Sequence, residues 1–367
     1  MGYFDTFWSN TLAATGVQRT FHPEDPEALL KGRAYLRVYA GGTWSYSFLF
    51  SNTVDSTYAD GSDTTANHVP GPWTLAEALV GVAGAVGEEP CWQPLTFGGG
   101  PSKAVAPGEV FSTDPVTLTA EKGQYLVLQL AYRGAEIPYL EENIIPLFTE
   151  SADGFVPGNR MPLPAMAGCS RPVRLRAAFL GDSITEGIGT EFGAYRHWNA
   201  MIAEGLREAY GWWNLGIGYG RAADAAMDGA WLAKAKAADL VNVCYGVNDL
   251  YQKHDGEALK RDLAFIVEKL TEAGCTVGLF TVPPFDYPPE LEPLWREVNR
   301  FIAEELGPKV RYVYDTRPFW GKEPPLDHMS AHGAHPDETG CALLAEDFCA
   351  RMKGVFESAC QKNEFSV

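Results

Sequence analysis

The sequence predicts two domains of different fold class, an all-β sandwich followed by an α/β domain with a parallel sheet. The chain has 367 residues, and at about 100–200 residues per domain this length fits two or three domains. Its 46% hydrophobic content is enough to fill sizeable cores. The first half is rich in short strand-like runs, whereas the second half alternates strand and helix patterns.

The all-β prediction for the first half rests on short runs of Val, Tyr, Phe, Thr and Leu separated by turn residues. Gly, Pro, Asn and Asp clusters stand between these runs, at the spacing typical of a sandwich. One segment, 73–86, fits either a helix or a pair of buried strands, because its periodicity does not decide. The expected strands are 33–39, 44–50, 110–111, 116–119 and 124–132.

A linker is expected where prolines and glycine accumulate. Residues 156–172 contain Pro157, Pro162, Pro164 and Gly168. Such composition is common between domains. We therefore predict an N-terminal domain over 1–172, with the linker starting near 156, and a second domain over 173–367.

The second half contains five strand-and-helix units. The clearest helix carries Leu259, Leu263, Ile266, Val267 and Leu270 on one face. Five successive βα units predict a parallel sheet covered by helices on both faces. The expected strands are 176–180, 212–215, 240–245, 276–282 and 310–314, with helices around 194–210, 222–238, 259–270, 291–306 and 336–356.

Charge and composition argue against several classes of partner. The net charge is −18, and the halves before and after residue 172 contribute −9 each. Nucleic acids and anionic membranes are therefore poor candidate partners. The N-terminus lacks a signal-peptide pattern, no apolar run reaches 18 residues, and the odd number of cysteines, seven, is typical of a reduced protein. We expect a cytoplasmic protein.

Ser183 is the first candidate for chemistry. It follows the first strand of the second half, in the sequence Gly181-Asp182-Ser183. Glycine permits a sharp turn at the strand end, which would place the serine oxygen above the sheet edge. Taken alone, this pattern is more often a serine that caps a helix. The Gly-x-Ser-x-Gly elbow of α/β-hydrolases does not occur in the sequence.

Three further loops make a functional interpretation more specific. A glycine-rich loop, 216–220, follows the second strand, Asn248 follows the third strand, and His335 follows the fifth. A nucleophile, backbone N–H donors, an amide donor and a base thus lie in four βα loops. All four loops are at the carboxyl ends of parallel strands, where open α/β sheets bind ligands.

These blocks resemble the SGNH (GDSL-type) hydrolase superfamily over residues of roughly 173–360. The resemblance implies a flavodoxin-like, three-layer sheet and a serine hydrolase in which Ser183 attacks an acyl carbonyl after His335 removes its proton. It also implies an oxyanion hole formed by the Ser183 N–H, the Asn248 side chain and the N–H of Gly218 or Gly220. The register of the second block leaves that choice open.

The sequence departs from the superfamily at one position. An Asp usually stands three residues before the histidine, but this chain has His332 there. Three alternatives remain: a carboxylate from elsewhere, with Asp327 as the candidate, orients His335; a backbone carbonyl does so in a Ser–His dyad; or activity is impaired. A wrongly oriented imidazole can cost about 10⁴-fold in turnover.

Two other interpretations of these segments have less support. His328, His332 and His335 lie within eight residues, but Gly333 and Pro336 interrupt a helix there, and no carboxylate or Cys pattern completes a metal site. The glycines at 216, 218 and 220 are followed by Arg221 where a dinucleotide fingerprint needs glycine. We expect neither a metal nor another cofactor.

The first half resembles the β-sandwich found before the catalytic domain in certain SGNH carbohydrate acetylesterases. Residues 48–52, 96–99 and 112–116 carry this resemblance, which implies a jelly-roll-like domain that supplies a wall of the substrate cleft. Its tryptophans could stack on sugar rings, although each is more simply explained as a core residue. The tryptophans considered are Trp8, Trp44, Trp73 and Trp92.

The sequence thus predicts a serine esterase that removes short acyl groups, acetyl in particular, from a carbohydrate or related small molecule. The expected partner is a small-molecule or oligosaccharide ester. The alternatives are a lipase or thioesterase of the same superfamily, and a carbohydrate-binding protein whose hydrolase site has decayed. The oligomeric state does not follow from the sequence.

Overall fold

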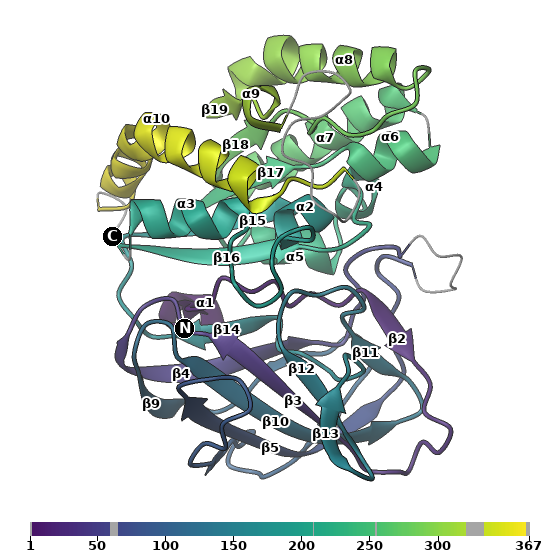
Figure 1. Cartoon of the computed structure of the whole chain (residues 1–367), viewed down its shortest axis with the longest axis vertical. Helices are drawn as coiled ribbons and strands as arrows, with labels where there is room; N and C mark the ends of the chain where they lie inside the picture. The colour runs from purple at the N-terminus through teal and green to yellow at the C-terminus, as the bar shows by residue number, and fades with distance from the viewer. Residues whose placement is uncertain (1, 59–64, 208, 254, 321–333, 365–367) are drawn as a thin grey trace. The chain divides into compact units, whose positions relative to one another are not determined.

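The computed structural model describes residues 2–58, 65–207, 209–253, 255–320 and 334–364, the last four without their side chains. The chain divides into two compact units, Met1–Pro172 and Val173–Val367 (Figure 1). Across the described ranges, no helix combines the length and the apolar character needed to cross a membrane.

The first unit is built from antiparallel strands, as the fold-class prediction expected. Its described part holds a five-stranded sheet, with β9 attached to the path β1-β14-β4-β8, and a seven-stranded sheet, with β7 attached to β13-β12-β3-β10-β5-β6. The elements are α1 (Tyr3–Thr6), β1 (Trp8–Ser9), β2 (Arg19–Phe21), β3 (Leu30–Arg37), β4 (Gly42–Ser51), β5 (Trp73–Ala83), β6 (Gln93–Pro94), β7 (Lys103–Val105), β8 (Val110–Ser112), β9 (Val116–Ala120), β10 (Tyr125–Gly134), β11 (Ile137–Tyr139), β12 (Leu147–Ser151), β13 (Gly154–Pro157) and β14 (Met166–Cys169).

Two segments of this unit refine the sequence predictions. The undecided segment 73–86 is a strand, β5, which pairs along its length with β10. The expected linker is wrong, because β14 lies within 156–172 and pairs with β4 on one side and β1 on the other. Its residues are buried. The prolines of this stretch flank a short sheet strand rather than mark a connection between domains.

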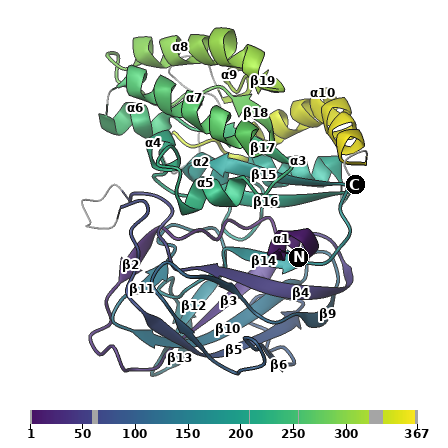
Figure 2. The ribbon, with the colours of Figure 1, turned by 180° about the vertical axis from the view of Figure 1, so that it is seen from behind.

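The second unit is a parallel sheet with helices on both faces. Its five described strands run in the order β16-β15-β17-β18-β19, which is the flavodoxin-like order. Helices α3 and α10 contact each other on one face, and α7 contacts α4 and α8 on the other. Figure 1 shows α3 and α10 in front of the sheet, and Figure 2 shows α5 and α7 in front of it from behind.

The elements of this unit follow one another as strand and helix, with three short helices near the strand ends. They are β15 (Leu175–Gly181), α2 (Ser183–Glu186), α3 (Trp198–Leu206), β16 (Tyr210–Gly216), α4 (Ala222–Ala225), α5 (Ala230–Ala235), β17 (Leu240–Cys244), α6 (Val247–Lys253), α7 (Gly256–Glu272), β18 (Thr276–Phe280), α8 (Glu292–Phe301), a π-helical turn (Ile302–Leu306), a 3₁₀ turn (Gly307–Lys309), β19 (Tyr312–Tyr314), α9 (Arg317–Trp320) and α10 (Glu338–Glu364).

The core of the second unit explains why its strands read as continuous apolar runs. Every residue of β16 and β17 is buried, as expected for a sheet covered on both faces. Phe179 of β15 stacks on Trp212 at a ring-centroid distance of 5.4 Å and meets Trp198 edge-on at 5.2 Å. This packing holds α3 against the sheet and thereby fixes the end of β15.

Two helical segments differ from the sequence expectation. The helix expected at 222–238 is split into α4 and α5, because Asp228 between them adopts a positive φ of 55°. Asn248, expected in the βα loop after the third strand, lies in the helix α6, Val247–Lys253. Asn248 therefore stands in the first turn of a helix.

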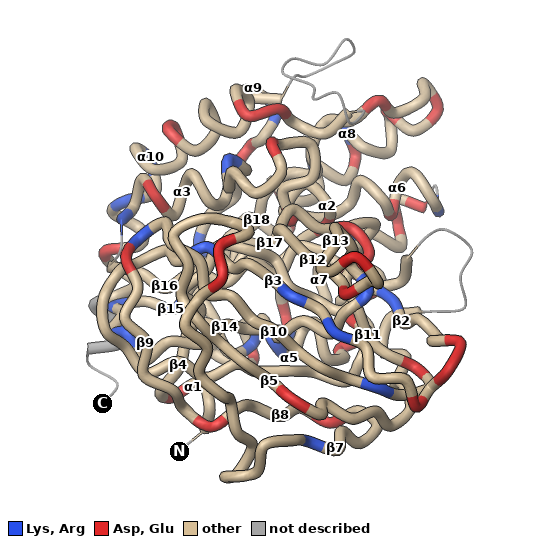
Figure 3. Tube along the Cα trace, turned by 60° about the horizontal axis from the view of Figure 1, so that its bottom comes forward, with Lys and Arg blue, Asp and Glu red and all other residues tan. Residues whose placement is uncertain are grey.

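Charged residues are spread over the chain. Figure 3 shows acidic and basic positions interspersed along both units. All seven cysteines are free in the structure, and five of them are buried.

Candidate active site

Three strand ends lie side by side in the second unit. In the pairing register, Gly181 at the end of β15 is aligned with Gly216 of β16 and with Cys244 of β17. Strand β15 lies between β16 and β17, so the chain adds β16 on one side of β15 and β17 on the other. Such a switch point is where open α/β sheets bind ligands. The loops that carry Ser183, the glycines and Asn248 therefore start from one place.

Gly181 allows the close approach of neighbouring elements at this strand end. A Cβ atom there would lie 2.1 Å from the Thr185 Oγ1 and 2.5 Å from the Cys244 carbonyl oxygen. Both distances are far below van der Waals contact. The glycine predicted from the sequence as a turn residue is thus required by packing.

Asp182 starts the short helix that Ser183 opens. Its carboxylate accepts a hydrogen bond from the Ile184 N–H at 3.0 Å and so caps α2. The capping residue is therefore Asp182, not Ser183, which leaves the serine hydroxyl for other contacts. Ser183 is 9% exposed, so most of its surface is covered by neighbouring residues.

The structure brings Ser183 and His335 together. The Ser183 Oγ and the His335 Nε2 are 2.8 Å apart, which is hydrogen-bonding distance. A serine hydroxyl in this contact can pass its proton to the imidazole. The start of α10, next to His335, is tied to the loop after α2, because Glu338 pairs with Arg196 at 2.6 Å and accepts from the Glu191 N–H at 3.2 Å.

The glycine-rich loop forms a tight turn beside Ser183. The Gly220 N–H donates to the Ile217 carbonyl at 3.0 Å, and Tyr219 between them has a φ of 58°. A Cβ atom on Gly216 would lie 2.1 Å from the Glu186 backbone nitrogen, so the loop passes directly against α2. The N–H of Gly220 is already engaged within the loop.

Asn248 and Asp249 attach α6 to the glycine-rich loop. The Asn248 Nδ2 donates to the Gly220 carbonyl at 3.0 Å. The Asp249 carboxylate accepts from the N–H groups of Ala222 and Ala223 at 3.0 and 3.1 Å, at the start of α4. These three bonds hold the loop and the amide in one arrangement.

Two carboxylates are buried beneath this arrangement. Burial raises the pKa of Asp182 to about 7, and the negative charge of Asp249 adds to the effect. Burial likewise raises the pKa of Asp249 to about 6, against the opposing backbone hydrogen bonds from Ala222 and Ala223. Both carboxyl groups can therefore be protonated at mildly acidic pH.

Aromatic side chains flank His335. The Phe285 ring, from the loop after β18, packs edge-to-face against the imidazole at a centroid distance of 5.6 Å. Tyr251 of α6 packs edge-to-face against Phe285 at 5.9 Å. The sequence did not single out these two residues, although both follow strands whose ends lie at this edge.

Several predicted residues of this region lie outside the described residues. Asp327, His328 and His332 fall within 321–333, so the candidate orienting acid and two of the three histidines have no structural account. Within the described ranges, no group of three or more His, Cys, Asp or Glu residues could hold a metal ion.

In the first unit, residues that carry the resemblance to the acetylesterase sandwich form hydrogen bonds with other residues of the unit. Asp114 accepts hydrogen bonds from the N–H groups of Gly98 and Gly99 and from the Thr96 hydroxyl, at 2.6–2.9 Å. The Asn52 side chain accepts from the Trp73 Nε1 at 3.0 Å. These residues hold the fold of the unit.

The tryptophans of the first unit show the same structural use. Trp8 and Trp73 are each 3% exposed and belong to the core. Trp92 is half-buried, donates to Glu89 at 2.7 Å and lies under the Arg33 guanidinium. Trp44 is half-buried against Gly42.

Comparison with known proteins identifies the second unit. Residues 179–343 match the model of the GDSL-like Lipase/Acylhydrolase family. These residues form a GDSL-like lipase/acylhydrolase domain. The match contains Ser183, Asn248 and His335, and the parallel sheet preceded by a β domain agrees with the predicted fold class. No curated protein matches the chain.

Solved structures similar to the chain include an esterase and a lipolytic protein of the G-D-S-L family. The esterase EstA from Pseudoalteromonas sp. is 16% identical, with a TM-score of 0.41, covering 50% of this chain and 98% of its own. A lipolytic G-D-S-L family protein from Veillonella parvula is 20% identical, with a TM-score of 0.40 and coverages of 48% and 97%. The YxiM protein from Bacillus subtilis is 13% identical, with a TM-score of 0.39 and coverages of 87% and 80%.

Proposed function

We propose that the GDSL-like domain is a serine esterase that removes short acyl groups, acetyl in particular, from a carbohydrate or a related small molecule. The observation that carries the proposal is the 2.8 Å contact between the Ser183 Oγ and the His335 Nε2. Ser183 follows β15, which lies at the switch point of the sheet, and the proposed donors besides Ser183 follow its two neighbours β16 and β17.

In the proposed reaction, the Ser183 oxygen attacks the acyl carbonyl while His335 takes the hydroxyl proton. The new C–O bond gives a tetrahedral intermediate whose oxyanion accepts hydrogen bonds from the Ser183 N–H and the Asn248 amide. The N–H of Gly218 or Gly220 supplies the third donor, and the Gly220 N–H also binds the Ile217 carbonyl. One such donor is typically worth about 3 kcal/mol in the transition state.

The protonated His335 then gives its proton to the leaving alcohol oxygen as the C–O bond of the ester breaks. This step leaves an acyl group on Ser183. Water, deprotonated by His335, attacks the acyl carbonyl and releases the carboxylic acid, and the Ser183 oxygen regains its proton. Atoms and charge balance without a further reactant.

The short acyl group and the sugar-like alcohol are the classes that the sequence resemblance implies. The resemblance of residues 48–52, 96–99 and 112–116 to the sandwich of carbohydrate acetylesterases supports the alcohol class. Asn52, Gly98 and Asp114 form hydrogen bonds within the first unit. We therefore interpret the resemblance as one of fold and assign these residues no contact with the substrate.

A chain-length series tests the proposal. Hydrolysis of p-nitrophenyl esters from acetate to palmitate should be fastest with acetate, and acetylated mono- and oligosaccharides should lose acetyl groups by mass spectrometry. Preference for palmitate would instead support the lipase alternative. Glycan binding without turnover, together with no labelling of Ser183 by a fluorophosphonate, would support the decayed-site alternative.

A further inference from the structure

We propose that Phe285 and Tyr251 form the subsite for the alcohol part of the ester, and that they select alcohols whose hydroxyl is carried on a ring. The inference rests on the proposed esterase function and extends it to a substrate class. It is carried by the row of three rings His335, Phe285 and Tyr251, in which neighbouring centroids lie 5.6 and 5.9 Å apart.

The position of Phe285 sets which part of the substrate it meets. His335 must reach the leaving oxygen to protonate it, so the alcohol lies beside the imidazole when the acyl group is on Ser183. Phe285 packs on that imidazole. A group attached to the leaving oxygen therefore passes next to the Phe285 ring.

Tyr251 extends this aromatic surface outward. It stands three residues after Asn248 in α6, and residues three apart share one face of a helix. Its side chain is therefore on the same face as the proposed oxyanion amide. Tyr251 is 45% exposed, so part of its ring remains accessible next to Phe285.

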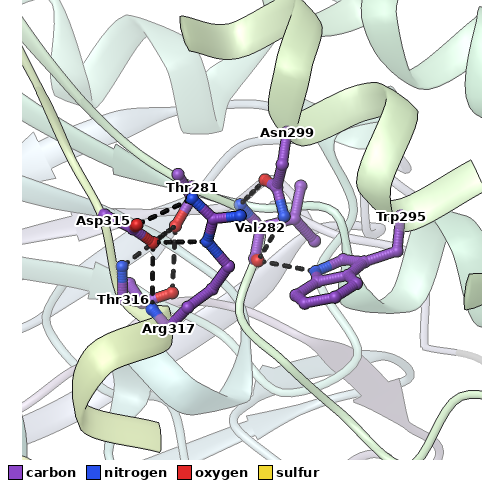
Figure 4. A network of polar contacts seen from close by, with 7 residues as sticks. All are labelled: Thr281, Val282, Trp295, Asn299, Asp315, Thr316 and Arg317. Carbon is purple, nitrogen blue, oxygen red and sulfur yellow. Dashed lines mark hydrogen bonds and ion pairs between the residues drawn. The ribbon is translucent and has the colours of Figure 1, made fainter. Parts of the chain in front are cut away.

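The segment that carries Phe285 is held in place before any substrate arrives. Figure 4 shows that α8 binds both backbone groups of Val282, at the start of this segment. The Asn299 Oδ1 accepts from the Val282 N–H at 2.7 Å, and the Val282 carbonyl accepts from the Trp295 Nε1 at 2.9 Å and the Asn299 Nδ2 at 3.2 Å. Further along, the Tyr287 hydroxyl donates to the Pro283 carbonyl at 3.2 Å.

The end of β18 is fixed as well. The Thr316 N–H donates to the Thr281 hydroxyl at 3.0 Å, and Arg317 pairs with Asp315 at 2.7 Å (Figure 4). A rigid aromatic surface loses little conformational entropy when a ligand binds to it. Ring faces of pyranoses, cyclohexyl groups and arenes can stack on such a surface, whereas a flexible open chain covers it less well.

Two acetate esters with matched leaving groups test the inference. Cyclohexyl acetate and 3-hexyl acetate are both esters of secondary six-carbon alcohols, and they differ in the ring. The parent enzyme should have a higher kcat/KM for cyclohexyl acetate. Tyr251→Ala should lower the ratio of the two values by about three- to tenfold, the size expected for loss of one aromatic contact. Tyr251→Phe, which keeps the ring, should restore the ratio.

Controls separate this inference from the function on which it rests. Leu343→Ala, which removes a side chain of similar exposure (43%) on α10, should leave the ratio unchanged. Phe285→Leu should lower the ratio and also kcat on every ester, because Phe285 contacts His335. Ester turnover by the parent enzyme tests the function, whereas the ratio tests the subsite.

An unchanged ratio in Tyr251→Ala would overturn the subsite. If the preference between acetate and butyrate esters of one alcohol shifts at the same time, the aromatic pair lies on the acyl side. If the parent enzyme has no turnover, saturation-transfer NMR with cyclohexanol gives an independent readout: binding should be weaker in Tyr251→Ala, and equal binding would reject the subsite.

Discussion

The Asn248 carboxamide donates a hydrogen bond to the carbonyl oxygen of Gly220 at 3.0 Å. A carboxamide has two N–H donors, so one can hold the glycine-rich loop while the other binds an oxyanion. The same side chain therefore connects α6 to the glycine-rich loop, the two elements from which the proposed mechanism takes donors besides the Ser183 N–H.

Replacing Asn248 by alanine should lower kcat by about 10²–10³-fold, because it removes a donor that is worth most in the transition state. KM for p-nitrophenyl acetate should change little. Steady-state kinetics provide the check, with Gln252→Ala in the same helix as the control. A kcat within twofold of the parent would remove Asn248 from the proposed oxyanion hole.

Gly181→Ala should destabilise the protein and reduce activity together, since the added Cβ atom would lie 2.5 Å from the Cys244 carbonyl oxygen. Backbone at that distance has to shift, and Ser183 is two residues away. We expect a loss of about 1–3 kcal/mol in the free energy of unfolding, the usual cost of overpacking. Urea denaturation measures it.

Gly354→Ala is the matched control for this substitution. A Cβ atom there meets no other group within 4 Å, and the residue lies inside α10. Alanine is favoured over glycine within a helix, so stability should be unchanged or slightly higher. Equal destabilisation by both substitutions would mean that crowding at Gly181 is not the cause.

The buried Asp182 predicts a specific dependence of stability on pH. Its pKa is about 7 in the folded protein, where burial is the main cause, and about 3.9 in an unfolded chain. The folded protein thus binds the proton more tightly. The contribution of Asp182 to the free energy of unfolding is therefore largest below about pH 4 and is lost as the pH rises through about 7.

Asp182→Asn should remove this part of the pH dependence, while the amide oxygen can still cap α2. Denaturation midpoints between pH 4 and 8 should fall more steeply in the parent protein than in the variant. Parallel curves for the two proteins would show that Asp182 has an ordinary pKa.

Glu338 should matter for catalysis through the position of His335. Glu338→Ala removes both the ion pair with Arg196 and the bond from the Glu191 N–H, whereas Glu338→Gln can keep the second. We expect a several-fold loss of kcat in the alanine variant and a smaller loss in the glutamine variant. Unfolding free energies should change by less than about 1 kcal/mol, because the pair is partly exposed. Equal kcat values for both variants and the parent would contradict this role.

The sequence was sufficient for those features that depend on local pattern. Alternating strand and helix signals gave the parallel sheet, and the residues just after its strands included Ser183, Asn248 and His335. The register of β15 against β16 and β17 then places the ends of these three strands side by side. Parallel strands of similar length bring their carboxyl ends to one edge.

Features that depend on packing could not be predicted from local sequence patterns. The strand β14 was taken for a linker because prolines at 157, 162 and 164 outweighed four buried residues. Phe285 was missed because its relevance comes from contact with His335, 50 positions later in the chain. Asp249 directly follows Asn248 in the chain, yet its hydrogen bonds to Ala222 and Ala223 depend on the fold of α4.

The central claim is that the Ser183 oxygen is the nucleophile activated by His335. The most direct measurement is kcat for p-nitrophenyl acetate in Ser183→Ala, alongside mass-spectrometric detection of a fluorophosphonate adduct on the parent protein. We predict a loss of about 10⁴-fold or more in kcat and an adduct on Ser183. An unchanged kcat in Ser183→Ala, or an adduct on another residue, would contradict the account.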